Sequence, residues 1–387
     1  MAMEQAFRGV VSKIRRRYGD MAAQGAAVPF AVRANGSAEA FGDGEPAFTF
    51  VVREPRALDA LATLDGLVVG EAYLAGAFDV EGDIERVLEM RDLFSDRHPL
   101  LYAWRFVQPR LFGQVKSDEK WIPAHYDTES DFFLRFLDTR HRAYSQGIYA
   151  RDDEPLEDAI TRKLDFARDS AGIRPGDRVL DVGGGWGAFT EYGGKQDVRV
   201  TSLTISPESE RFLNGMIERE RLPCEVRREH LFAHQPAEKY DAIVVLGVTE
   251  HLPDYPGTLK KYRSLLKPGG KVYLDASACR RKYDLTAFVE RHIYPGNGSP
   301  MCLHDYLGAV AASPFRLEGV FDDRHSYALT AREWARRLDA HRDDVERRWG
   351  KALYRKFQLF LWGTADGMAR DTLQAYRVVL GLPKAAA

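Results

Sequence analysis

The sequence predicts an α/β protein: a Rossmann-like, doubly wound sheet forms the larger part, and a smaller N-terminal α+β domain precedes it. Two observations predict the larger part. From about residue 155, buried strands alternate with amphipathic helices, which is the pattern of a parallel sheet covered on both faces. The first of these strands also leads directly into a glycine-rich loop that opens a helix. The smaller domain is predicted from residues 28–80, where short alternating runs are separated by turns containing Gly and Asp.

The elements of the larger part follow one another in a regular order. Strands are predicted over Arg178–Val182, Val198–Leu203, Asp241–Leu246 and Lys271–Asp275. Helices are predicted over Leu156–Ala171, from Gly187 onward, over Ser206–Glu220 and over Pro256–Leu266. Turn residues mark the breaks, with Pro175-Gly-Asp177 before the first strand and Lys267-Pro-Gly-Gly270 after the last helix.

The domain boundary is predicted from a change in composition. Ala47–Val52 is a short apolar run typical of a strand in the smaller domain. A charged, aromatic-rich stretch follows that domain and ends near Lys116–Lys120, which we expect to be a linker. We therefore predict a first domain over residues 1–118 and a second over residues 119–387.

Composition restricts the classes of function. The net charge of −2 gives no overall attraction to nucleic acid. The three cysteines, Cys224, Cys279 and Cys302, lack the spacing of zinc ligands, so we expect neither a disulfide nor a bound metal. No apolar run approaches the roughly 20 residues that span a bilayer, and the N-terminus lacks a secretory signal pattern. We expect a cytoplasmic protein that contacts the inner membrane surface at most peripherally.

The N-terminal segment has a local bias toward a basic amphipathic helix. Its apolar residues repeat at helical spacing, and basic residues occupy the remaining faces, among them Arg15, Arg16 and Arg17. Such a helix can lie on an anionic membrane surface. It can equally pack its apolar stripe on its own domain, and the two arrangements are compatible. The apolar stripe consists of Phe7, Val10, Val11, Ile14 and Tyr18.

The glycine loop Asp181-Val-Gly-Gly-Gly-Trp-Gly187 points to a nucleotide-like ligand. Between a strand and a helix, it lets backbone N–H groups and the helix N-terminus approach a ligand closely. Its spacing also satisfies the looser dinucleotide fingerprint, and a tight turn without any ligand is a further alternative. Asp181 suits a ligand with a cationic amino-acid end. The second strand ends in Leu203-Thr-Ile-Ser206, without the acidic residue that binds the ribose of NAD. Together these features favour S-adenosylmethionine as the ligand.

Several motifs, in order along the chain, resemble the cyclopropane-fatty-acyl-phospholipid synthase family, which includes the mycolic acid methyltransferases. The N-terminal matches are Gly70-Glu-Ala-Tyr-Leu-Ala-Gly76 and Phe78-Asp79. The later matches are His125-Tyr-Asp127, Asp131-Phe-Phe133, Tyr144-Ser145, Val182-Gly-Gly-Gly-Trp-Gly187, Leu203-Thr-Ile-Ser206, Glu250-His251 and His292-Ile-Tyr-Pro295. The resemblance thus covers most of the chain.

The resemblance implies a Rossmann-like methyltransferase fold with a lipid-facing N-terminal domain. It also implies S-adenosylmethionine as methyl donor and methyl transfer to the cis double bond of an unsaturated acyl chain. It implies a set of donor-binding residues at matching positions, namely Tyr144, Ser145, Asp181, Gly183, Gly185, Trp186, Gly187 and Thr204. The acid expected near the adenine falls on Glu229 or on His230. Trp186 is equally explained as a packing residue, and Tyr144 and Ser145 as parts of a surface turn.

The chemistry requires an anion, because transfer to an alkene leaves a carbocation that must be stabilised or deprotonated. The resemblance implies a bicarbonate held by a cysteine, a glutamate, a histidine and a tyrosine. Only the glutamate, Glu250, is present in this sequence. Gln146 replaces the cysteine, Asp275 replaces the histidine, and Leu359 or Phe360 replaces the tyrosine. A second carboxylate would repel bicarbonate, which argues against bicarbonate as the base and against a cyclopropane product.

A protein carboxylate is the expected replacement. Asp275 and Glu250 in a poorly hydrated site would raise each other's pKa, so that either residue could serve as the base. Gln146 would bond to the glutamate or line the pocket. Simpler roles stay open, because Asp275 could cap the turn after its strand and Glu250 could bond to local backbone amides. His251 is also explained as a structural residue.

The leading hypothesis is a C-methyltransferase that acts on an unsaturated fatty-acyl chain of a membrane phospholipid and gives a methylated or methylene-bearing chain. A true cyclopropane synthase with an altered base site is the first alternative. A methyltransferase for a small metabolite and a non-catalytic lipid-binding homologue are the others.

Overall fold

The computed structural model describes residues 2–96, 98, 129–294 and 298–384. The chain divides into two compact units. The first comprises Met1–Leu101, Thr286–Ile293 and Leu338–Asp366, and the second comprises Tyr102–Leu285, Tyr294–Arg337 and Gly367–Ala387. The predicted boundary between residues 118 and 119, the expected linker at 116–120 and the motif His125-Tyr-Asp127 lie outside the described residues.

The first unit is built on a small mixed sheet, as the alternating pattern of residues 28–80 predicts. Its strands lie in the order β2-β1-β3-β4, with β1 and β3 parallel and the two outer pairs antiparallel. The strands are β1 (Phe30–Ala34), β2 (Ser37–Phe41), β3 (Phe48–Val52) and β4 (Phe78–Gly82). The helices beside them are α1 (Ala2–Ala22), α2 (Pro55–Thr63), α3 (Gly66–Leu74), α4 (Ile84–Glu89) and α12 (Ala287–His292), with α15 (Arg342–Trp349) and most of α16 (Lys351–Ala369).

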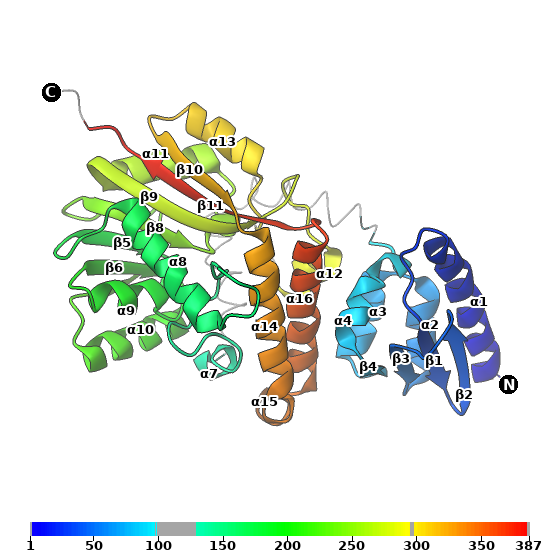
Figure 1. The fold of residues 1–387 in the computed structure, drawn as a ribbon. Helices are drawn as coiled ribbons and strands as arrows, with labels where there is room; N and C mark the ends of the chain where they lie inside the picture. The colour runs from blue at the N-terminus through cyan, green and yellow to red at the C-terminus, as the bar shows by residue number, and fades with distance from the viewer. Residues whose placement is uncertain (1, 97, 99–128, 295–297, 385–387) are drawn as a thin grey trace. The chain divides into compact units, whose positions relative to one another are not determined.

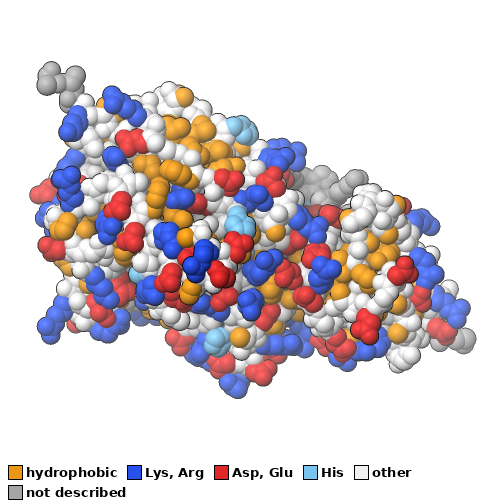
Figure 2. Space-filling model, viewed as in Figure 1, with side chains coloured by type: hydrophobic (Ala, Val, Ile, Leu, Met, Phe, Trp, Pro, Cys, Tyr) orange, Lys and Arg blue, Asp and Glu red, His pale blue; other side chains and the backbone are white. Residues whose placement is uncertain are grey.

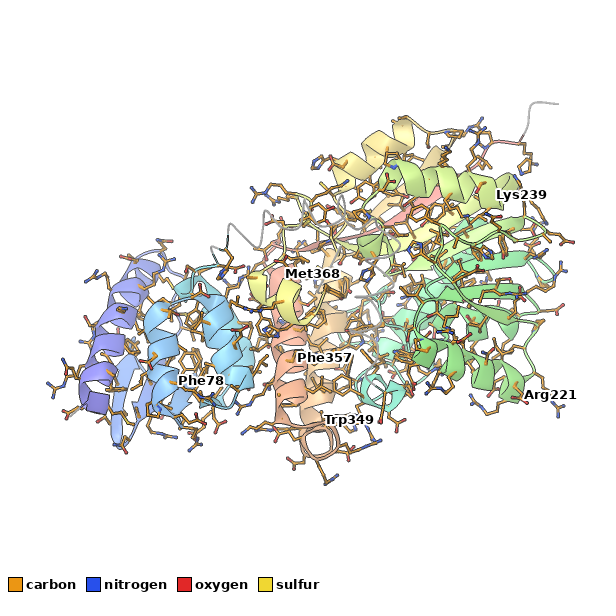
Figure 3. All side chains as sticks on the ribbon, turned by 180° about the vertical axis from the view of Figure 1, so that it is seen from behind. Phe78, Arg221, Lys239, Trp349, Phe357 and Met368 are labelled. Carbon is orange, nitrogen blue, oxygen red and sulfur yellow. The ribbon has the colours of Figure 1, made fainter. Side chains whose placement is uncertain are left out.

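Aromatic side chains form the centre of this unit. Phe30 stacks on Phe48 with ring centroids 5.0 Å apart, and Phe50 meets the edge of Phe78 at 5.5 Å. Figure 3 labels Phe78 among the side chains of this core. Offset and edge-on ring pairs add to the area burial that drives folding. The first unit therefore has a hydrophobic core of its own.

The apolar stripe of α1 faces this core. Phe7, Val10 and Ile14 are at most 7% exposed and belong to the hydrophobic cluster of the first unit. The basic side chains contact the same unit: Lys13 donates to the Ala62 carbonyl at 2.8 Å, and Arg15 forms an ion pair with Glu39. The prediction that α1 packs on its own domain is thus confirmed.

The second unit holds a seven-stranded sheet with the order β10-β11-β9-β8-β5-β6-β7 (Figure 1). The five strands from β9 to β7 are parallel, which confirms the predicted doubly wound sheet. The strands are β5 (Arg178–Val182), β6 (Arg199–Thr204), β7 (Glu225–Arg228), β8 (Tyr240–Leu246), β9 (Leu266–Ala278), β10 (Arg316–Asp322) and β11 (Gln374–Gly381). The last two are antiparallel additions to one edge, which the sequence analysis did not predict.

Helices cover both faces of this sheet (Figure 1). The first group is α8 (Leu156–Ala171), α9 (Ala188–Gly194) and α10 (Pro207–Glu220), and the opposite group includes α11 (Tyr255–Leu265) and α13 (Leu303–Ala311). The short α7 (Ser130–Phe133) precedes the sheet, and α14 (Arg324–Ala340) follows β10. The predicted helix over 156–171 and strand over 178–182 agree with α8 and β5 to the residue.

One predicted break is wrong. The run Lys267-Pro-Gly-Gly270 was expected to separate a helix from a strand at Lys271, but β9 begins at Leu266 and continues to Ala278. Tyr240 pairs with Leu266 and Ala242 pairs with Lys271, so the strand register shifts across the glycines. Proline and glycine are tolerated there because an irregularity in the ladder accommodates them.

Among the described residues, no helix has the length and apolarity that a bilayer crossing requires. Acidic and basic side chains alternate over the face shown in Figure 2, in keeping with the net charge of −2.

Candidate active site

The glycine loop lies where β5 ends and α9 begins, and its backbone explains its composition. Gly183, Gly185 and Gly187 all have positive φ angles, of 80°, 50° and 83°. A Cβ atom at position 183 would lie 2.3 Å from the side chain of Val248. The loop therefore requires glycine both for its conformation and for the close approach of the neighbouring strand end.

A cavity opens at this loop, at the carboxyl ends of the parallel strands, where ligands of doubly wound sheets bind. It encloses about 1070 Å³ of empty space, part of it open to solvent. The sequence-predicted residues that line it are Tyr144, Ser145, Asp181, Gly183, Gly185, Trp186, Thr204 and Glu229, with His230 and His251. Gly187 does not line the cavity, because its α-carbon faces Met216 and Leu213.

Asp181 is an anion held in place at the floor of the cavity. It is 2% exposed, and its carboxylate accepts hydrogen bonds from Thr190 at 3.0 Å and from Ser202 at 3.2 Å. Burial raises the pKa of Asp181 to about 6, against the two hydrogen bonds, which lower it. The residue is thus ionised at neutral pH and able to receive a cationic ligand group.

Glu229 occupies another wall and is oriented by a relay of side chains. Its carboxylate lies 2.7 Å from Nδ1 of His234, and Nε2 of the same ring lies 2.9 Å from the hydroxyl of Tyr240. The two contacts fix the ring and thereby the direction of the carboxylate. His230, the alternative acid position, also lines the cavity.

Aromatic rings form a third wall of the cavity. Phe133, from α7, packs against Tyr144 and Trp186 with ring centroids 5.4 and 5.3 Å away. Among the described residues, the buried indole N–H of Trp186 has no hydrogen-bond partner. Tyr144 and Trp186 line the cavity, so their rings can pack against a partly aromatic molecule such as S-adenosylmethionine.

Glu250 follows β8 in the short 3-10 helix η2 (Thr249–His251), and its two carboxylate oxygens differ. Oε1 accepts hydrogen bonds from the backbone N–H of Ser277 at 2.7 Å and from its hydroxyl at 2.8 Å. Oε2 is buried and has no hydrogen-bond partner in the described part of the chain. Burial raises the pKa of Glu250 to about 7, and the nearby charge of Asp275 contributes to the rise.

Asp275 is surrounded by partners that the sequence analysis did not predict. Its Oδ2 lies 3.6 Å from Nζ of Lys163, on α8, and both side chains are fully buried. Lys163 also donates to the Ser145 hydroxyl at 2.7 Å, and Ser145 donates to Asp275 at 3.4 Å. The other oxygen, Oδ1, accepts from the Gly247 N–H at 2.9 Å. Burial raises the pKa of Asp275, while Lys163 opposes the rise. Asp275 thus ties two segments of the cavity wall, at Ser145 and Gly247, to α8.

Gln146 belongs to a second buried polar cluster. The residue is completely buried, near Asp323, which forms a 2.6 Å ion pair with Arg377 on β11. Burial raises the pKa of Asp323 to about 6, against the opposing effects of Arg377 and of the Gln146 amide. The structure therefore places Gln146 beside Asp323. The three predicted catalytic residues do not line the cavity itself, namely Gln146, Glu250 and Asp275. Leu359 packs against the core of the first unit.

Comparison with known proteins identifies the family. The family described as mycolic acid cyclopropane synthetase matches residues 114–378, more than half of the chain. The chain belongs to this family, as the sequence motifs predict. A domain of unknown function matches residues 18–96.

Named relatives of the chain are lipid methyltransferases. A probable fatty acid methyltransferase of Mycobacterium tuberculosis is 27% identical over 312 residues, which cover 76% of this chain and 70% of the relative. A sphingolipid C9-methyltransferase of Candida albicans is 25% identical over 331 residues, or 80% of this chain. The match spans only 64% of the length of that fungal protein.

Solved structures agree with the fold. A cyclopropane synthase of Mycobacterium tuberculosis is 26% identical and superposes with a TM-score of 0.63, over 71% of this chain and 99% of the other. A mycolic acid cyclopropane synthase solved with S-adenosylhomocysteine, at 24% identity and a TM-score of 0.62, shows the same fold over 70% of this chain and 98% of its own. The predicted Rossmann-like methyltransferase fold is confirmed.

Proposed function

We propose that the protein is an S-adenosylmethionine-dependent C-methyltransferase that acts on the double bond of an unsaturated fatty-acyl chain. The cavity at the glycine loop supports the donor, because Asp181 and Glu229 present fixed carboxylates and Tyr144 and Trp186 present aromatic rings. When bound, S-adenosylmethionine supplies the methyl group. The relatives that are named as sphingolipid and fatty acid methyltransferases support a lipid acceptor.

The single observation that carries the chemistry is the asymmetry of Glu250. Ser277 fixes one carboxylate oxygen, and the other is buried and free of hydrogen bonds from described residues. Methyl transfer forms a C–C bond at one alkene carbon and leaves positive charge on its neighbour. We assign Glu250 to stabilise that charge and to accept the proton whose loss restores a neutral chain. A pKa of about 7 suits a base at neutral pH.

Asp275 has a different role in this proposal. Its carboxylate is matched by the buried ammonium of Lys163 and bonded by Ser145 and Gly247, so it acts as an anchor of the cavity wall. The residues do not fit a bound bicarbonate, because Gln146 and Asp275 stand where the resemblance implies a cysteine and a histidine as ligands, and the buried ammonium of Lys163 is already paired with Asp275. We therefore derive no step through bicarbonate.

The proposed acceptor is an unsaturated phospholipid, reached by peripheral contact with a membrane, and the product a methyl- or methylene-bearing chain. The proton that leaves decides the product. Loss from the acyl chain keeps all three hydrogens of the transferred methyl group. Loss from the methyl group gives a cyclopropane ring when that carbon bonds to the cationic neighbour. It gives a methylene group when a hydride first shifts from the methyl-bearing carbon to the cationic neighbour.

The test is mass spectrometry of lipids from a host that expresses the protein and is fed methionine with a trideuterated methyl group. Three retained deuterium atoms show a methyl branch. Two retained deuterium atoms show a methylene group if mild hydrogenation adds hydrogen, and a cyclopropane if it does not. Glu250→Gln should reduce labelling by about 10²-fold or more. Unlabelled lipids together with a labelled small metabolite would refute the lipid acceptor.

A further inference from the structure

A sharp turn over residues 138–142 lies beside the glycine loop and is held from within by one carboxylate. Asp138, which is 1% exposed, accepts from the backbone N–H of His141 at 2.6 Å and of Ala143 at 2.7 Å. Its own carbonyl accepts from the N–H of Arg142 at 3.1 Å. The turn therefore has a single, well-determined conformation.

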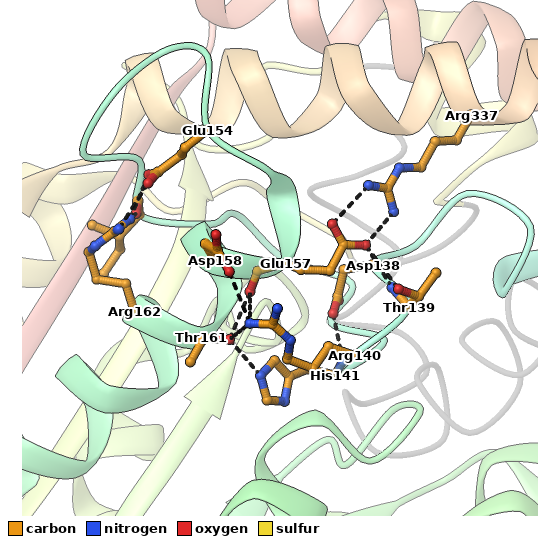
Figure 4. A network of polar contacts seen from close by, with 11 residues as sticks. Asp138, Thr139, Arg140, His141, Glu154, Glu157, Asp158, Thr161, Arg162 and Arg337 are labelled. Atoms are coloured by element: carbon orange, nitrogen blue, oxygen red, sulfur yellow. Dashed lines mark hydrogen bonds and ion pairs between the residues drawn. The ribbon is translucent and has the colours of Figure 1, made fainter.

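The same turn is fastened to α8 by the polar contacts in Figure 4. Thr139 donates its backbone N–H to Glu157 at 3.0 Å, and Arg337 donates to the same carboxylate at 2.9 Å. His141 lies 2.8 Å from the hydroxyl of Thr161. Because α8 packs on the central sheet through β9, the turn is fixed relative to the strands that carry the glycine loop.

Arg142, at the end of this turn, reaches the glycine loop directly. Its φ angle is 60°, in a region that residues other than glycine seldom occupy. Nε donates to the carbonyl of Trp186 at 3.1 Å, and the guanidinium forms an ion pair with Glu191 on α9. The side chains of Arg142 and Glu191 are only 17% and 11% exposed. Arg142 itself lines the cavity.

We propose that Arg142 is a positioning residue for the methyl donor, which fixes the Trp186 end of the glycine loop by bridging its carbonyl to α9. The inference rests on the proposed function, because it takes the cavity to be the donor site. A guanidinium donates along several directions from one rigid plane, so it can hold the carbonyl and the carboxylate together. A lysine ammonium has a similar charge but lacks this fork.

The arrangement also places a guanidinium at the cavity wall. Arg142 lines the cavity, and its partner Glu191 is shared with Lys195, which in turn lies 3.8 Å from Glu220. Asp181 and Glu229 line the same cavity with negative charge. A zwitterionic amino-acid end, such as that of the donor, thus meets charges of both signs.

The experiment is calorimetric titration of the full-length protein with S-adenosylhomocysteine, so no acceptor is needed. Arg142→Lys keeps the charge and removes the fork. Arg142→Gly removes the side chain, while glycine adopts the positive φ readily. Both should bind about tenfold or more weakly than the wild type. Arg151→Gln is the control, because Arg151 lies outside the turn and the cavity lining, is exposed and pairs with Asp153 at 3.1 Å. It should bind like the wild type.

Turnover separates positioning from simple stability. At saturating donor, Arg142→Lys should recover most of its kcat while its KM for the donor stays raised, because the reacting groups themselves are intact. A wild type that fails to bind S-adenosylhomocysteine would refute the proposed function. If the wild type binds and both Arg142→Lys and Arg142→Gly bind with the same affinity, the role of Arg142 is overturned, even if the melting temperatures of the two variants fall. The proposed function would then be unaffected.

Discussion

Two buried carboxylates near the donor cavity respond to pH at different values, because their surroundings differ. Asp181 accepts hydrogen bonds from two hydroxyl groups, and burial brings its pKa to about 6. Glu250 has one carboxylate oxygen fixed by Ser277, and its burial near Asp275 brings its pKa to about 7. Donor binding and proton abstraction are therefore expected to fail at separate pH values.

The first prediction concerns the pH dependence of turnover. A base must be ionised, so kcat at saturating donor should be constant above pH 7 and fall about tenfold per pH unit below it, as Glu250 becomes protonated. The KM for the donor should begin to rise only near pH 6, where Asp181 is protonated. Steady-state kinetics from pH 5 to pH 9 check the pH dependence of both kcat and the KM for the donor. A kcat that is unchanged between pH 8 and pH 5.5 would exclude Glu250 as the base.

The second prediction separates an anchor from a base at Asp275. Asp275→Asn leaves the ammonium of Lys163 buried without its counter-charge, which should lower the free energy of unfolding by about 3–5 kcal/mol. Lys163→Met should destabilise by a similar amount, and the double variant, which removes both charges, should recover much of the loss. Urea denaturation measures all three. If Asp275→Asn keeps wild-type stability but loses turnover, Asp275 is the base instead.

At the residue scale, the sequence predicts the residues that line the cavity better than the buried charged residues behind them. The residues of the glycine loop and Tyr144-Ser145 are recognisable because their spacing along the chain is itself the motif. Lys163 looks like an ordinary polar residue of an amphipathic helix, and Arg377 like a charged residue in a late strand. Their burial follows from how distant segments pack, which a local pattern does not contain. The anchor role of Asp275 was open in the sequence for the same reason.

At the scale of elements, hydrophobic periodicity predicts those helices and strands that have a buried face of their own. The helix α8 and the strand β5 have clear patterns and clear ends, so their bounds are predicted to the residue. The edge strand β10 alternates poorly, with Leu317 47% exposed and Phe321 38% exposed. Its pairing with β11 depends on a neighbour about 60 residues away along the chain, and not on its own pattern.

The third prediction tests the packing of α1. Ile14 is completely buried in the core of the first unit, so Ile14→Ala should lower the free energy of unfolding of that unit by about 2–5 kcal/mol. Arg16→Gln, on an exposed position of the same helix, is the control and should change it by less than about 0.5 kcal/mol. Hydrogen exchange of residues 2–96 measures both. Equal exchange rates in the two variants would contradict the observed packing and make α1 available to a membrane.

At the scale of the whole molecule, the first unit is discontinuous in sequence. The predicted single cut between residues 118 and 119 does not describe it, because Thr286–Ile293 and Leu338–Asp366 cluster with the N-terminal residues. A change of composition reveals a linker but not a segment that returns from the far end of the chain. The returning segment brings Arg355 and Gln358 to the first unit, and Gln358 accepts a hydrogen bond from Tyr73 at 2.8 Å.

The last prediction follows from Arg355, whose side chain is fully buried in the first unit. It donates to the carbonyls of Tyr73 and Phe78 at 2.5 and 2.9 Å and forms an ion pair with Asp79. Arg355→Leu removes both hydrogen bonds, although the Tyr73 carbonyl still accepts from the Gly76 N–H at 3.0 Å, and it takes one partner from the half-buried carboxylate of Asp79, so it should destabilise the first unit by about 3 kcal/mol.

The donor cavity lies entirely in the second unit, so the same variant should bind S-adenosylhomocysteine with the affinity of the wild type. Hydrogen exchange should show lost protection in β4 and α3, and calorimetry an unchanged Kd. Arg347→Leu, an exposed position on the neighbouring α15, is the matched control and should leave both measurements unchanged. A tenfold loss of donor affinity in Arg355→Leu would show that the two units fold as one, because the hydrogen bonds and the ion pair that the variant removes lie within the first unit.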